Sequence, residues 1–337
     1  MPDRDLPYGF DELDSNVQVH PDNPNVVKCF VRGCQHFVHR QTRDRKGKLC
    51  PDHEIFCHLS GGTPTYSYRD VRRNVIASPE LFGDKIIGHP FKFDSKYLGN
   101  EKSEDTLSWN VFRSLHEANL LAGVAKQLIG EDFVEEPDLY LWGIRASDDR
   151  FEPWDLLIQA RQYFEDDLPV DRPLTEPDIA LHLPGQYLVL IEAKFTSQNT
   201  FYTSGPQTKK GELTFDQLLD IYQFPEMRLL HDPEVARQKE RVHYQLWRNT
   251  VFADWMARHD SPQTKPYHVN LVREGFEEHS EPEFQQLVRK EHAKQFRRAT
   301  WEEIYRWLKQ ENLHPHLEKY FEQKSASLEK CFQTNRG

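Results

Sequence analysis

The sequence predicts an α/β protein that is preceded by a small metal-binding module. Residues 176–181 and 187–195 form two short apolar stretches joined by a turn-forming segment at 183–186, which is typical of two paired β-strands. Segments with helical periodicity lie on both sides of this pair. Ahead of them, four cysteines fall within a short polar stretch that ends at Cys57. Strands and helices together indicate the α/β class, and the clustered cysteines indicate the module.

Composition is that of a globular protein. The chain has 337 residues, of which 37% are hydrophobic and 12% aromatic, enough for one large core or two domains. No run approaches the roughly 18 apolar residues of a membrane span. The first five residues lack the basic and apolar regions of a signal peptide, so we expect a cytoplasmic location and no membrane partner. Nothing in the sequence indicates a homo-oligomer.

Charge is distributed unevenly along the chain. The formal net charge of −11 argues weakly against extensive nucleic-acid binding, which depends on basic side chains. Residues 28–48, however, carry seven basic side chains against one acidic, whereas residues 131–178 carry fifteen acidic side chains against four arginines. The chain therefore has a basic segment near its N-terminus and an acidic segment in its centre. For the acidic segment we favour a solvated surface.

The cysteine cluster predicts a structural zinc site. In a tetrahedral zinc site, two short turns each supply a pair of ligands that lie close together in the sequence. The cysteine cluster contains two such pairs. The favoured ligands are Cys29, Cys34, Cys50 and His53. Cys57 is an alternative to His53, and three further histidines keep the choice open, namely His36, His39 and His58. The span is too polar to form a core of its own, and the basic residues between the two ligand pairs favour contact with nucleic acid.

Composition and motifs along the sequence divide the chain into five segments. They are a polar N-terminal lead (1–27), the zinc-finger-like module (28–60), an irregular, turn-rich connector (61–99), the main α/β domain (100–310) and a C-terminal helix (311–337). In the main domain, Ser103 is a candidate N-cap for a helix that runs towards Leu121. Residues 139–144 predict a strand, and residues 154–164 predict a short helix or a decorated loop.

The second half of the main domain predicts a long loop and further helices. Residues 196–227 form an insertion too long for a tight turn, and it contains Lys209 and Lys210. One helix is expected over 233–258, a strand over 267–272 and a helix over 282–294. Thr300 and Glu303 form a capping-box pattern that opens another helix.

Three charged residues lie at one end of the paired strands. Side chains alternate along a strand, so Glu192 and Lys194 point to the same side. Asp178 opens the preceding strand, and two carboxylates that face hydrated space are suited to Mg²⁺ or Mn²⁺. Such an ion would activate water and stabilise the charge on a phosphodiester, while Lys194 orients the water or offsets that charge. The plain alternative is that Glu192 and Lys194 are exposed residues at a strand end and that Asp178 belongs to a turn.

This arrangement resembles the PD-(D/E)XK nuclease superfamily, whose fold is restriction-endonuclease-like. The resemblance rests on Pro177-Asp178 and Glu192-Ala193-Lys194, and it extends over about residues 100–310. It implies a mixed central sheet flanked by helices, with Asp178 and Glu192 on the catalytic metal and Lys194 assisting the water.

The resemblance also suggests further site residues. The first core helix of the family often adds an acidic residue, for which Glu104 is the candidate and Glu117 the fallback. Several branches place a glutamine on the helix after the lysine strand, and Gln245 is similar. The long insertion after Lys194 departs from a minimal core of this fold.

The expected function is therefore that of a metal-dependent nuclease acting on nucleic acid, with a DNA endonuclease favoured. The zinc module would help to hold the nucleic acid, and a restriction or antiviral-defence role fits the resemblance. The alternative is a catalytically inactive nucleic-acid-binding or scaffold protein on the same fold.

Overall fold

The structure is a computed structural model, and the residues it describes are 14, 17–41, 47–60, 63–87, 98–148, 150–168, 175–204 and 213–331. Two compact units make up the chain. Residues 1–114 and 308–337 form the first unit, and residues 115–307 form the second. None of the helices among the described residues is long and apolar enough to span a membrane.

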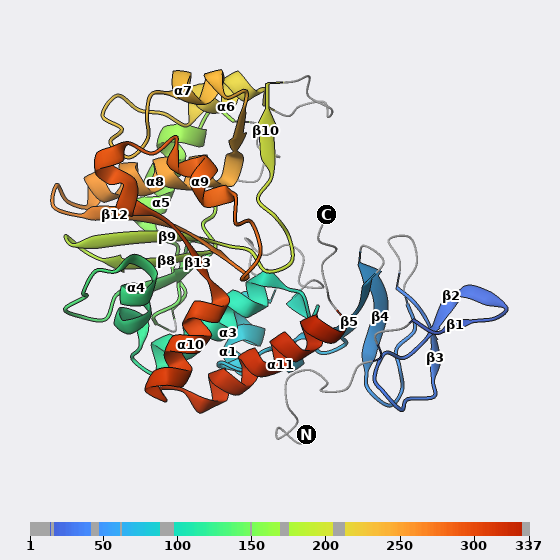
Figure 1. Cartoon of the computed structure of the whole chain (residues 1–337). Coiled ribbons are helices and arrows are strands. Elements are labelled where there is room, and N and C mark those ends of the chain that lie inside the picture. Colours follow the sequence, from blue (N-terminus) through green and yellow to red (C-terminus); the bar gives the residue numbers. More distant parts are fainter. Residues whose placement is uncertain are drawn as a thin grey trace. The chain divides into compact units, whose positions relative to one another are not determined.

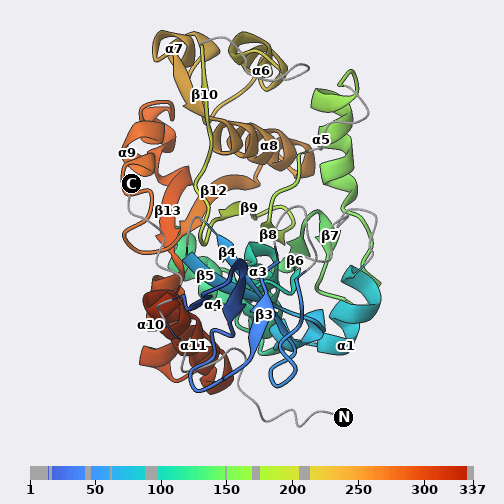
Figure 2. The same cartoon turned by 90° about the vertical axis from the view of Figure 1, so that its right-hand side faces the viewer.

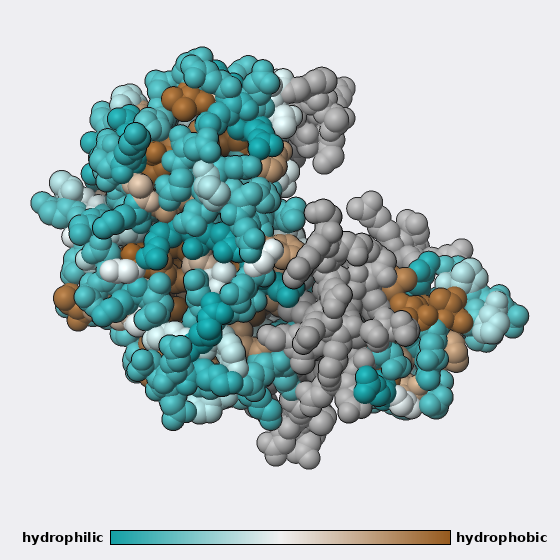
Figure 3. Space-filling view, in the orientation of Figure 1, coloured by the Kyte–Doolittle hydropathy of each residue, from teal (hydrophilic) through white to brown (hydrophobic). Residues whose placement is uncertain are grey.

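Short antiparallel strands dominate the start of the first unit (Figure 1). A three-stranded sheet contains β1 (Val19–His20), β2 (Asn23–Lys28) and β3 (Phe37–His39). A hairpin follows, made of β4 (Ile55–Ser60) and β5 (Thr63–Tyr68). Val19 and Phe37 are 47% and 46% exposed. Figure 3 shows a hydrophobic patch over β1–β3.

Helical elements complete the first unit. They are η1 (Val71–Asn74), α1 (Pro79–Leu81), η2 (Phe82–Ile86), the start of α3 (Glu104–Glu117) and α11 (Pro315–Cys331). The predicted cap of α3 is confirmed, because Ser103 Oγ accepts a hydrogen bond from Thr106 N at 3.2 Å. A buried ion pair of 2.9 Å between Lys324 and Glu101 attaches α11 to this unit. The connector expected to be irregular contains β5 and three short helical elements, so that prediction was wrong in part.

The second unit is built on a six-stranded mixed sheet, which confirms the predicted fold class. Its strands, in spatial order, are β13 (Phe296–Thr300), β12 (Lys265–Val272), β9 (Tyr187–Ala193), β8 (Ile179–Leu183), β6 (Asp138–Leu141) and β7 (Ile144–Arg145). β12 runs parallel to both β9 and β13, whereas the other neighbours are antiparallel. Every residue of β8 is buried, as expected for a strand covered on both faces.

Helices cover both faces of this sheet (Figures 1 and 2). One face packs against α8 (Tyr244–Asp260), which contacts β9 and β12 and packs beside α5 (Asp155–Glu165). The other face carries α4 (Leu121–Ile129), which contacts β12 and β13. A large apolar cluster lies on the α8 side and includes Trp247, Phe252 and Leu190. Strand β9 therefore lies in the middle of a buried layer, and its C-terminal end carries Glu192.

The single helix expected over 233–258 is wrong. The structure has α7 (Pro233–Gln238), then β11 (Arg241–His243), then α8. Glu240 adopts φ of 56°, a left-handed conformation that cannot continue a helix. β11 pairs with β10 (Phe201–Thr203), which lies within the predicted insertion. The apolar periodicity ran across this break because both halves face the same core.

Other elements differ in detail. The strand expected over 139–144 turns back at Trp142 and Gly143, whose φ values are 54° and 78°, as a two-residue hairpin turn requires. The helix expected over 282–294 divides into α9 (Ser280–Gln285) and η3 (Lys290–Gln295). The insertion contains α6 (Phe215–Ile221) as well as β10, and its Lys209 and Lys210 lie outside the described residues. The capping box at Thr300 and Glu303 is confirmed and opens α10 (Trp301–Glu311).

Candidate active site and metal centre

In the first unit, the Cys/His cluster forms a candidate metal centre. The ligand atoms of Cys29, Cys34, Cys50 and His53 all lie within 4.8 Å of one another. Two turns deliver them. Gly33, with φ of 84°, allows the chain to bend between the first two cysteines, and Glu54, with φ of 52°, ends the second turn after His53. Three buried thiols and one half-buried imidazole in a compact group suit tetrahedral zinc.

The electrostatics of this cluster are consistent with metal binding. Desolvation by burial lowers the pKa of His53, which favours the neutral imidazole that a metal requires. Burial raises the pKa of Cys50 to about 12, so in the absence of a positive ion this thiol keeps its proton. The guanidinium of Arg73 donates to the carbonyl of His53 at 2.9 Å and holds the second turn in place.

The structure also separates the alternative ligands from the four. Cys57 is buried next to Cys29, and a hydrogen bond with Cys57 is the largest influence raising the pKa of Cys29. Cys57 is nevertheless outside the group of mutually close ligand atoms. His36 instead pairs with Asp52 at 3.1 Å, and His58 hydrogen-bonds Ser67 at 2.8 Å. The geometry therefore favours His53 as the fourth ligand.

In the second unit, the neighbouring ends of strands β8 and β9 bring together Asp178, Glu192 and Lys194. Because Ile179 pairs with Ile191, the antiparallel register places Asp178 beside Glu192. Asp178 Oδ2 accepts a hydrogen bond from Ala193 N at 2.8 Å, which joins the two strand ends. Glu192 Oε1 accepts one from Lys194 Nζ at 2.5 Å. The two side chains lie on the same side of β9, as the strand alternation predicts.

This pair is buried, which contradicts the alternative of an exposed strand end. Glu192 is 1% exposed and Lys194 is 7% exposed. A carboxylate and an ammonium taken out of water are strongly destabilising unless they are paired and hydrogen-bonded. Trp301 Nε1 donates to the Lys194 carbonyl at 3.0 Å, and Lys194 N donates to the carbonyl of Leu271 at 2.8 Å, so the backbone of the lysine is fixed as well.

Helix α8 supplies two amides to the same carboxylate. Gln245 Nε2 donates to Glu192 Oε1 at 2.5 Å, and Asn249 Nδ2 donates to Glu192 Oε2 at 2.7 Å. The two amides are four residues apart and therefore lie on one helical face. The resemblance to the nuclease superfamily predicts Gln245, whereas it does not predict Asn249. The spacing of the two amides is the signal that would have identified Asn249.

Helix α5 holds the segment that leads into Asp178. The carboxylate of Glu165 accepts a hydrogen bond from Thr175 N at 2.9 Å and one from the Tyr222 hydroxyl at 2.8 Å. Arg161 Nε donates to the carbonyl of Thr175 at 2.6 Å. Thr175 is completely buried and lies three residues before Asp178. No local sequence pattern connects α5 with the site, because the role of this helix depends on tertiary packing.

The two remaining candidates lie on helix α3. Glu104 is half-buried in the first turn of α3 and belongs to the first unit, and Glu117 is exposed at the other end of that helix. Participation of either residue stays a prediction. The donor set of Asp178 and Glu192 fits a hard divalent cation, since both are carboxylates at adjacent strand ends.

Comparison with known proteins identifies a related family. Residues 169–324 match the family model described as "Restriction Endonuclease associating with ARP". The match covers a little under half of the chain and includes Asp178, Glu192, Lys194 and Gln245. It supports a restriction-endonuclease-like family, as the sequence motif had suggested. No curated protein matches the chain, and no solved structure matches it.

Proposed function

We propose, starting from the match to a restriction-endonuclease-like family, that the protein is a metal-dependent nuclease. The observation that carries this proposal is the environment of Glu192. This buried carboxylate lies beside Asp178 and receives hydrogen bonds from Lys194 and Gln245. A buried, precisely oriented carboxylate next to a second one is costly for a purely structural role, whereas it is what a metal-assisted hydrolysis needs.

Each residue has a distinct role in this proposal. Asp178 and Glu192 would hold Mg²⁺ or Mn²⁺, and the bound ion would supply an activated water and neutralise phosphodiester charge. Lys194 positions the attacking water or offsets the charge that develops on the phosphate. Gln245 and Asn249 hold the Glu192 carboxylate in one orientation. Glu104, with Glu117 as the fallback, is the candidate for a further carboxylate.

DNA is the favoured substrate, and the zinc module would help to bind it. Arg32 and Lys48 are exposed on this module, and Phe37 presents a half-exposed ring near them in the sequence. Cations that meet phosphates, combined with an aromatic face that stacks on a base, are the two elements of many nucleic-acid-binding surfaces. The description of the matched family names a restriction endonuclease, which supports a role in restriction, and antiviral defence is the wider role that we propose with it.

A cleavage assay tests the catalytic role. Wild-type protein is incubated with plasmid, single-stranded DNA and RNA in Mg²⁺ or Mn²⁺, alongside Lys194→Ala and the isosteric Asp178→Asn. We expect cleavage by the wild type and a loss of at least about 100-fold in both variants. Lys265→Ala is the matched control, because this lysine is exposed at the start of β12 and pairs only loosely, at 3.7 Å, with Glu131. It should cleave like the wild type.

One observation favours the second candidate, an inactive nucleic-acid-binding protein. Three side chains already donate to the two oxygens of Glu192, an arrangement that is stable without an ion. If the wild type and Lys194→Ala are equally inert on all substrates yet shift DNA in a gel, this second function replaces the first.

A further inference from the structure

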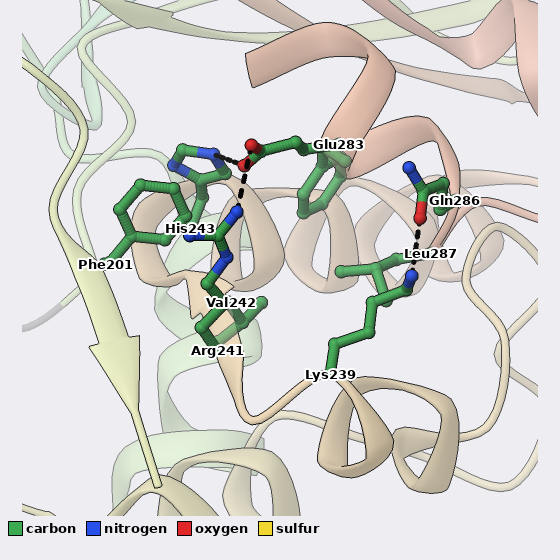
Figure 4. Close-up of a pocket in the computed structure, with 9 residues that line it drawn as sticks. Phe201, Lys239, Arg241, Val242, His243, Glu283, Gln286 and Leu287 are labelled. Carbon is green, nitrogen blue, oxygen red and sulfur yellow. Dashed lines mark hydrogen bonds and ion pairs between the residues drawn. The ribbon is translucent and has the colours of Figure 1, made fainter. Parts of the chain in front are cut away.

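A pocket of about 370 Å³ lies between the β10–β11 strand pair and helix α9 (Figure 4). Phe201 and His243, which pair directly across the two strands, form one wall. Phe284 and Leu287 contribute apolar surface from the α9 side. The volume falls in the range of sites that take a small organic ligand, roughly 300–1,000 Å³.

The buried wall of the pocket carries an imidazole with unused hydrogen-bonding capacity. His243 is only 3% exposed, and its Nδ1 has no hydrogen-bond partner within the described part of the chain. Its Nε2 lies 3.5 Å from Glu283 Oε2, the pair that Figure 4 marks with a dashed line. Burial lowers the pKa of His243, so the neutral ring offers one donor and one acceptor. A buried polar group of this kind is costly unless a ligand satisfies it.

Two cations lie at the mouth of the pocket. Arg241 is 55% exposed, donates to Glu283 Oε1 at 3.0 Å and lies 5.0 Å from the ring centre of Phe201. Lys239 is exposed and donates to Gln286 Oε1 at 2.5 Å. Figure 4 shows both side chains extending alongside the apolar wall. The pocket therefore combines apolar side chains with polar groups that can recognise a ring edge and with basic groups suited to a phosphate.

Both strands of this wall are connected along the chain, over a few residues, to the candidate active site. β11 leads directly into α8, and Gln245, which donates to Glu192, is two residues after His243. Two residues span at most about 7 Å. On the other strand, Phe201 is seven residues after Lys194. A nucleic-acid strand with a phosphodiester at Glu192 would thus have a neighbouring nucleotide within reach of the pocket.

We propose that this pocket binds one unpaired nucleotide of the substrate strand. The base lies against Phe201 and the apolar wall, with its polar edge towards His243 and Glu283, and the phosphate lies at Arg241 and Lys239. This inference rests on the proposed nuclease function, because it assigns the pocket to the strand that is cleaved. It predicts that the enzyme acts on single-stranded or locally unpaired nucleic acid.

Binding of mononucleotides tests the pocket independently of cleavage, since dAMP and dCMP contain no internucleotide bond. Saturation-transfer NMR and calorimetry on the full chain would compare dAMP, deoxyadenosine and inorganic phosphate as probes. Phe201→Ala should weaken dAMP binding by about 5- to 150-fold, the usual effect of removing a base-stacking ring. Arg241→Gln should weaken dAMP but leave deoxyadenosine unchanged. Lys126→Gln is the matched control, since Lys126 is an exposed cation paired with a single carboxylate, Asp132, at 2.7 Å.

The outcomes separate this inference from the nuclease proposal. No saturable dAMP binding by the wild type, or equal binding by wild type and both pocket variants with unchanged unfolding midpoints, would overturn the pocket assignment even if DNA is cleaved. If dAMP binds and the variants weaken it while no substrate is cleaved, the pocket assignment stands and the nuclease proposal fails. A preference for single-stranded DNA that disappears in Phe201→Ala would support both.

Discussion

Asn249 Nδ2 donates to Glu192 Oε2 at 2.7 Å, on the oxygen opposite the one that accepts from Lys194. The two residues are 57 positions apart, and both are almost completely buried. The carboxylate is therefore held from two sides, by a strand neighbour and by helix α8. This contact orients Glu192 and restricts its rotation, which suits a group that must meet a metal ion in a defined direction.

Removal of the Asn249 amide should be costly. Asn249→Ala leaves an oxygen of a buried carboxylate without its donor, and we expect the free energy of unfolding to fall by about 1–3 kcal/mol. Urea denaturation measures this change. Gln159→Ala, which removes an exposed amide on α5, should change stability by less than about 0.5 kcal/mol. Equal midpoints for the two variants would contradict the role assigned to Asn249.

The Glu165 carboxylate should position Asp178 through Thr175. Glu165→Gln keeps the size of the side chain but removes the charge that accepts from Thr175 N and Tyr222. We expect a loss of stability of about 1–3 kcal/mol, because hydrogen bonds to charged groups are the stronger ones. We also expect slower cleavage with a weaker response to Mg²⁺, since the displaced segment carries Asp178. Normal Mg²⁺ dependence in a folded variant would show that α5 is not coupled to the site.

Zinc content should distinguish His53 from Cys57. Elemental analysis of the wild type should find about one zinc ion per chain. His53→Ala and Cys50→Ser should lose this ion, whereas Cys57→Ser, the matched control, should retain it because Cys57 is outside the four-ligand group. Retention by His53→Ala together with loss by Cys57→Ser would assign the fourth ligand to Cys57 instead.

Stability should fall below neutral pH because of His268. This residue is fully buried on β12 beside the Thr250 hydroxyl, at 2.7 Å, and burial lowers its pKa to about 3. In the unfolded chain, His268 has an ordinary pKa near 6.5 and binds a proton below that pH, whereas in the folded chain it stays neutral. From pH 6.5 towards 3, this residue should therefore reduce the free energy of unfolding by about 1 kcal/mol per pH unit.

The pH prediction is checked by urea denaturation at several pH values. His268→Gln should show a shallower decrease below pH 6.5 than the wild type, even if it is less stable overall. Replacement of His279, a histidine that is exposed to solvent, provides the control and should leave the slope unchanged. Identical slopes for wild type and His268→Gln would exclude His268 as the source.

Long-range relationships explain where the sequence-based predictions were wrong. The expected helix over 233–258 failed because Glu240 adopts a left-handed conformation and the residues after it pair with β10. Both segments are apolar on one side, so periodicity alone cannot detect the break. A two-stranded pairing between residues about forty positions apart depends on chain topology, which no local pattern reports.

The sequence by itself determined the features that depend on neighbouring residues. Strand alternation places Glu192 and Lys194 on one side, turn-length spacing brings Cys50 near His53, and the capping box at Thr300 starts α10. Only the tertiary structure decided which distant groups meet. Asn249 reaches Glu192, and α5 reaches the segment before Asp178, because packing of helices on the sheet closes separations that local periodicity cannot specify.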